Sequence, residues 1–164
     1  MSGHSVLATI PDPANAMAVE AVTDSGFTIT LDSAISQDAR RGPGPIEGLL
    51  GVLAGCTAMD VVSILRKKRQ VMRGYQVAVT GERADDDPRV YTHIVVEHRV
   101  VGDVDPEALR RSVELSATKY CPVNAMLSKS AEVEHRYRLW QGAPEGDGIA
   151  ERVAVTGPAG ATLG

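Results

Sequence analysis

Two cysteines, Cys56 and Cys121, are the residues of this 164-residue chain best suited to chemistry. Their thiols are expected to stay reduced, so they are either inert core residues or a redox-active pair. Cys56 lies in the most apolar stretch of the sequence, where burial raises a thiol pKa. Cys121 precedes Pro122, which places it at the start of a helix, where free amide groups stabilise a thiolate. From the residues alone, we expect Cys121 to be the more acidic thiol.

Other kinds of site find little support in the sequence. There is no Cys-x-x-Cys motif, no His-Glu-x-x-His motif and no paired Cys/His cluster, so we expect neither a metal nor a cofactor. A net charge of −4 and 4% aromatic residues argue against nucleic-acid binding. The uncharged run between Glu47 and Asp60 is shorter than the roughly 20 apolar residues of a membrane span. The start of the chain shows no secretory signal pattern, so we expect a cytoplasmic protein.

The elements that must position the cysteines follow from the hydrophobic pattern. Helices are expected from Pro45 to the basic run 66–69, after Asp105, and over 123–130; strands are expected over 16–23, 26–32, 75–80, 90–101 and 132–140. This order predicts an α+β fold with the helices on one face of antiparallel sheets. We expect one domain over 16–140, with segments 1–15 and 141–164 loosely ordered because of their Pro and Gly content.

The long helix that begins at Pro45 is apolar on every face of its first half. Such a helix must be buried on all sides, and one small sheet can cover only one of them. We therefore expect a second subunit to cover the rest, which makes the protein a homodimer. The glycines Gly48, Gly51 and Gly55 would let another backbone approach closely.

The segment 44–65 around Cys56 resembles the first cysteine helix of the OsmC/Ohr family, and the segment 116–123 around Cys121 resembles its second cysteine motif. The resemblance covers about residues 16–140, and 60–65 and 91–94 look closest to the YhfA-like branch. It implies an intertwined α+β homodimer with antiparallel sheets and a long central helix buried between the subunits.

The resemblance also implies a thiol-dependent peroxidase that reduces organic hydroperoxides and hydrogen peroxide in oxidative stress defence. By position, Cys56 attacks the peroxide and becomes a sulfenic acid, and Cys121 resolves it as a disulfide. A dithiol such as lipoamide, or another thiol reductant, then regenerates the pair. The resemblance thus gives the attacking role to the thiol that the residues alone rank as less acidic.

The sequence departs from the family's peroxidase pattern next to the helix start. Peroxidase members carry Glu directly after the helix-opening proline and an Arg in the preceding loop. Here Ile46 takes that place, Glu47 follows it about 100° around the helix, and the loop offers Arg40 and Arg41. The departure leaves a second function open, a non-catalytic dimer that binds a small apolar ligand.

Overall fold

The computed structural model describes residues 3–33 and 39–164, which divide into two compact units, Met1–Leu49 and Leu50–Gly164. The described part of the first unit holds an antiparallel sheet of β1 (Val6–Thr9), β2 (Val19–Thr23) and β3 (Thr28–Leu31). Both β2 and β3 lie inside the stretches predicted as strands. Gly26, with a φ of 86°, supplies the left-handed backbone conformation that the turn between them requires.

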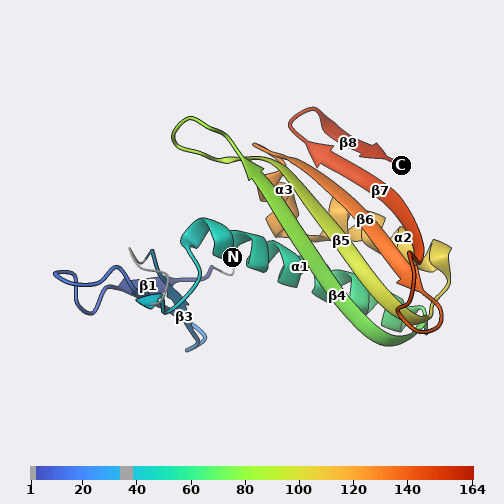
Figure 1. Ribbon diagram of the computed structural model, residues 1–164, viewed down its shortest axis with the longest axis horizontal. Helices are drawn as coiled ribbons and strands as arrows, with labels where there is room; N and C mark the ends of the chain where they lie inside the picture. Colours follow the sequence, from blue (N-terminus) through green and yellow to red (C-terminus); the bar gives the residue numbers. More distant parts are fainter. Residues whose placement is uncertain (1–2, 34–38) are drawn as a thin grey trace. The chain divides into compact units, whose positions relative to one another are not determined.

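The second unit is built on a five-stranded sheet (Figure 1). Its strands, in spatial and chain order, are β4 (Val71–Arg83), β5 (Tyr91–Asp103), β6 (Glu132–Trp140), β7 (Ile149–Gly157) and β8 (Gly160–Leu163). The pairing of β5 with β6 is parallel, so this sheet, which was expected to be antiparallel, is mixed. The reason is the helical crossover between these two strands, because parallel neighbours need a long connection.

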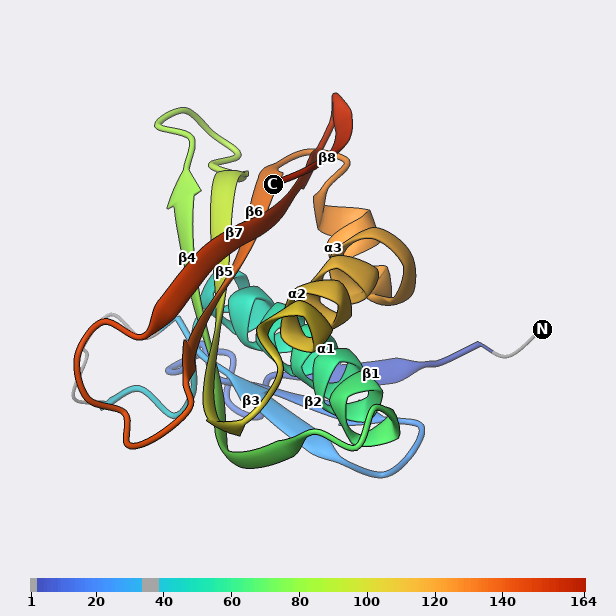
Figure 2. The ribbon, with the colours of Figure 1, turned by 90° about the vertical axis from the view of Figure 1, so that its right-hand side faces the viewer.

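That crossover consists of α2 (Pro106–Leu115), the π-helical turn η2 (Ser116–Tyr120) and α3 (Pro122–Leu127). As the sequence predicts, Asp105 caps α2, and its side chain accepts the Glu107 N–H at 3.2 Å. Within the second unit, α1, α2 and α3 lie on the same side of the sheet (Figure 2). The predicted arrangement of helices on one face is therefore confirmed.

Helix α1 (Pro45–Lys67) ends in its predicted basic turn at Arg66 and Lys67. One stripe of the helix, at four-residue spacing, is fully buried in the chain: Leu53, Thr57, Val61 and Leu65. Other apolar residues of the helix stay open to solvent in the single chain, with Val52 53% and Met59 75% exposed. All-round burial of α1 is thus not present within one chain.

By length and composition alone, α1 also qualifies as a helix that could cross a membrane, with a mean hydropathy of 1.9. Core helices meet the same criteria. Here Val61 and Leu65 pack in one apolar cluster with α2 and the sheet, and Leu53 packs in a second with β5 and Cys121. We therefore describe α1 as a core helix of the second unit.

The expectation of a loose segment over 141–164 is wrong. Strand β7 pairs with β6, and its Val153 and Ala154 are fully buried in the core. The glycines of this segment shape the connection instead of loosening it, since Gly146 and Gly148 adopt positive φ angles of 69° and 64° between β6 and β7. The expected loose N-terminal segment likewise contains β1, although all four of its residues are exposed.

Candidate thiol site

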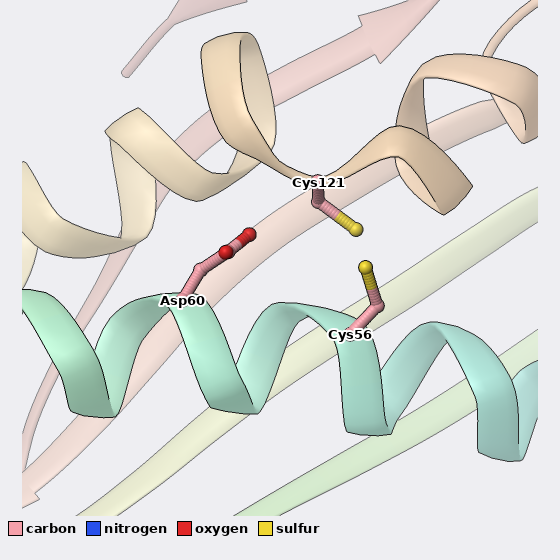
Figure 3. A group of neighbouring side chains, drawn as sticks. All are labelled: Cys56, Asp60 and Cys121. Atoms are coloured by element: carbon pink, nitrogen blue, oxygen red, sulfur yellow. The ribbon is translucent and has the colours of Figure 1, made fainter. Parts of the chain in front are cut away.

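The fold brings the two cysteines together, 65 positions apart in the sequence (Figure 3). Cys56 lies half-buried on α1, and Cys121, 3% exposed, lies between η2 and α3. Their sulfur atoms are within 4.8 Å of each other. Because a disulfide has an S–S length of about 2.05 Å, the sulfurs need to approach by less than about 3 Å to form one.

The position of Cys121 follows from the helix boundary predicted at Pro122. Cys121 is the N-cap of α3, and its Sγ accepts the Asn124 N–H at 3.3 Å. The N–H of Cys121 donates to the Ser116 carbonyl at 3.0 Å and so closes the π-helical turn. Such turns are frequent at functional sites, because the extra residue redirects a side chain. Here the redirected residue is a cysteine.

The prediction that Cys121 is an acidic thiol is wrong. Burial first, and then interactions with Cys56 and Asp60, raise the pKa of this thiol to about 12, although the Asn124 N–H acts to lower it. The capping bond is present as predicted, but the loss of water around the sulfur outweighs it. Cys121 is therefore a protonated thiol at neutral pH.

Asp60 is a third member of the site that the sequence analysis did not identify. It lies one helical turn after Cys56 on α1, and Figure 3 shows both side chains extending toward Cys121. A carboxylate oxygen of Asp60 lies within 4.8 Å of both sulfurs. The Ser116 hydroxyl donates to Asp60 Oδ2 at 3.0 Å. The four-residue spacing to a cysteine was the available signal in the sequence.

Behind Asp60, a chain of buried hydrogen bonds crosses the core. Ser116 bonds Thr57 (2.9 Å), Thr57 bonds His98 Nε2 (3.4 Å), and His98 Nδ1 bonds the Tyr75 hydroxyl (2.5 Å). Since Ser116 gives its hydrogen to Asp60, Thr57 must donate to Ser116, and His98 must donate to Thr57. His98 Nδ1 is then the acceptor for Tyr75. The donors thus all point in one direction and end on the Asp60 carboxylate.

The remaining predicted site residues belong to the first unit. Arg40 Nη2 pairs with Glu47 Oε2 at 3.0 Å, and the Gly44 N–H donates to the same oxygen at 3.2 Å. These two contacts lower the pKa of Glu47, the Gly44 bond most. Arg41 pairs instead with Glu20 at 3.0 Å, and its backbone N–H donates to Asp32. Arg40 and Arg41 therefore have different ion-pair partners, and the roles of Arg40, Arg41 and Glu47 remain predictions.

Comparison with known proteins places this arrangement in a family. The family model described as OsmC-like protein matches residues 36–136. Protein YhfA of Escherichia coli K12 is 40% identical over 116 residues, which are 70% of this chain and 84% of that protein.

Solved structures agree with this relation at the level of the fold. A hypothetical protein from Aquifex aeolicus VF5 superposes with a TM-score of 0.75 at 29% identity, covering 86% of this chain and 99% of its own. OhrB of Bacillus subtilis, an organic hydroperoxide resistance protein, gives 0.58 at 13% identity, covering 84% and 98%. The matched segment, the YhfA relation and the shared fold lead to one conclusion: the chain belongs to the OsmC-like family.

Proposed function

We propose that the protein is a two-cysteine thiol peroxidase that reduces organic hydroperoxides and hydrogen peroxide in oxidative stress defence. The observation that carries the proposal is the approach of Cys56 and Cys121 to within 4.8 Å in one chain. Cys56 is the attacking thiol and Cys121 the resolving thiol. This assignment suits their environments, since the half-buried Cys56 is the more accessible and the buried Cys121 stays protonated.

The reaction then has three steps. The Cys56 thiolate attacks one peroxide oxygen, the O–O bond breaks, and Cys56 becomes a sulfenic acid. The leaving alkoxide, or hydroxide from hydrogen peroxide, takes up a proton and departs as alcohol or water. The Cys121 sulfur attacks the Cys56 sulfur, forming the disulfide and releasing water. A dithiol reductant finally gives two electrons and two protons to the disulfide and leaves as its own disulfide.

In the same proposal, Arg40 or Arg41 supplies the positive charge that the family's peroxidase pattern requires, and Glu47 is the acid of that pattern. The protein acts on small hydroperoxides in the cytoplasm and works as a homodimer. The exposed apolar side chains Val52 and Met59 on α1 support the dimer, because a second copy of the chain would cover them.

The test is hydroperoxide consumption with dithiothreitol or dihydrolipoamide as reductant. Wild type and the matched control Ser63→Ala, an exposed position on the same helix, should turn over cumene hydroperoxide, and Cys56→Ser should not. In Cys121→Ser, dimedone should label Cys56 after one equivalent of peroxide. Absence of dimedone labelling at Cys56 in this variant would overturn the proposal. Absence of turnover, together with an apolar molecule retained in native mass spectrometry, would favour the ligand-binding alternative.

A further inference from the structure

The reduced thiol site has the composition of a metal site as well as of a redox pair. We propose that Cys56, Asp60 and Cys121 together bind a thiophilic divalent cation of the Zn²⁺ class when both thiols are reduced. The sequence predicted no metal site because no ligand spacing of the usual kind is present; the fold assembles the three ligands from two separate segments. The inference does not depend on peroxidase activity.

The ligand set favours a soft cation over Mg²⁺ or Ca²⁺. Two sulfurs and one carboxylate are typical Zn²⁺ ligands, with Zn–S bonds of about 2.3 Å and Zn–O bonds of about 2.0–2.2 Å. At these bond lengths, tetrahedral ligand atoms stand about 3.4–3.8 Å apart. The three ligand atoms of the site already lie within 4.8 Å of one another, so a contraction of at most about 1.4 Å brings them to these separations. The fourth position stays open to water or another small ligand.

Two of the three ligands accept hydrogen bonds from neighbouring residues, as the ligands of established metal sites do. Ser116 donates to Asp60 Oδ2, and the buried chain through Thr57 and His98 fixes Ser116 in turn. The Asn124 N–H donates to the Cys121 sulfur at 3.3 Å. These bonds hold the carboxylate and the sulfur in place before an ion arrives.

The charge of the three ligands also favours a bound cation. Three acidic side chains converge here, and their anionic forms repel one another unless a proton or a cation lies between them. On binding, each thiol releases its proton to solvent, and two thiolates with one carboxylate surround the ion. The metal and the disulfide exclude each other, because both use the same sulfur electron pairs. A bound ion would therefore shield the thiols from oxidation.

The test uses the full chain, reduced and free of oxygen, with Co²⁺ as a spectroscopic probe and Zn²⁺ as its competitor. Wild type should bind one Co²⁺ per chain with sulfur-to-cobalt charge-transfer absorption, and Zn²⁺ should remove that absorption. Cys56→Ser and Cys121→Ser should each weaken Zn²⁺ binding and reduce the absorption. Asp60→Asn and Ser116→Ala should each weaken binding by about tenfold or more. The exposed Asp103→Asn is the matched control and should bind as wild type.

A second measurement needs no variant and so does not depend on whether Asp60→Asn folds. One equivalent of Zn²⁺ should slow the reaction of both wild-type thiols with a thiol reagent, and a chelator should restore it. Absence of cobalt–sulfur absorption in reduced wild type, or its persistence at full strength in Cys56→Ser, would overturn the inference. Since no hydroperoxide is present here and no metal in the turnover assay, failure of one proposal is distinguishable from failure of the other.

Discussion

The Tyr75 hydroxyl donates to His98 Nδ1 at 2.5 Å and thereby begins the buried donor chain that ends on Asp60. Burial, and secondarily the Asp60 charge, raise the pKa of Tyr75 far above its ordinary value, so this hydroxyl keeps its proton. Burial lowers the pKa of His98 to about 3, so the ring stays neutral and can accept. Both protonation states agree with the direction that the donor chain to Asp60 sets for this bond.

Removing this first donor should destabilise the second unit. Tyr75→Phe leaves His98 Nδ1 buried without a partner, which should cost about 1–3 kcal/mol of unfolding free energy. Tyr120→Phe is the matched control, because that ring is 49% exposed and should change stability little. Urea unfolding followed by circular dichroism measures both. Equal stability of the two variants would contradict the donor chain.

Acid should destabilise the protein above the range in which carboxylates titrate. Burial lowers the pKa of His98 to about 3 and that of His135 to about 4, while both residues titrate near 6.5 when unfolded. Below pH 6.5 the unfolded chain therefore binds protons that the folded chain refuses, so stability falls as pH falls. With two such groups the slope approaches about 2.7 kcal/mol per pH unit.

This dependence is measured by urea unfolding between pH 7.5 and about 5, above the ordinary carboxylate range. His4→Gln is the control, because its side chain is 88% exposed and the substitution removes a histidine without altering either buried ring. A flat stability profile over this interval would show that the two buried rings do accept protons in the folded protein.

Much of the fold is predictable from local pattern. Alternating side chains locate β5 and β6, and the Asp105–Pro106 pair locates the start of α2, because these signals depend on neighbours in the sequence. The parallel pairing of β5 with β6 is not local and leaves no such signal. Strand β7 was missed because the glycines before it are typical of loose segments, while its buried Val153 shows only in three dimensions.

The candidate site likewise has features that the sequence predicts and features that it does not. Cys56 and Cys121 stand out by residue type, and Pro122 correctly marks the helix that Cys121 caps. Asp60 is recognised as part of the site from contacts made in the fold, with the two sulfurs and with Ser116, which lies 56 positions further along the chain. The high pKa of Cys121 was also unpredictable from sequence, because the helix start is visible there and the burial that outweighs it is not.

The contribution of β7 to the core can be tested directly. Val153→Ala removes two methyl groups from a fully buried position and should cost about 2 kcal/mol of unfolding free energy. Val71→Ala, at a position 58% exposed on β4, makes the same chemical change and should cost far less. Urea unfolding of the pair decides the point. Similar costs would mean that β7 does not contribute to the core.

The Arg40–Glu47 ion pair allows the two candidate arginines to be separated. Arg40 pairs with the candidate site residue Glu47, whereas Arg41 pairs with Glu20. We therefore expect Arg40→Ala to lower kcat/KM for hydroperoxide by about tenfold or more, and Arg41→Ala to change it little. The assay is the peroxide consumption described above. The reverse ranking would assign the charge to Arg41 instead.

Assembly is tested most sharply on α1, whose Val52 and Met59 are 53% and 75% exposed in a single chain. Leaving several side chains of this size in water forgoes about 1.5–3 kcal/mol each, against a whole-domain stability of about 5–15 kcal/mol. We therefore expect a homodimer whose folding and association are linked.

A Cβ at Gly51 meets open space in the single chain, so Gly51→Glu fits a monomer but places a charge on the face that a partner would cover. It should give insoluble or unfolded protein. Analytical ultracentrifugation at low micromolar concentration should find a dimer of wild type, and a folded 17.4 kDa species would refute the intertwined arrangement.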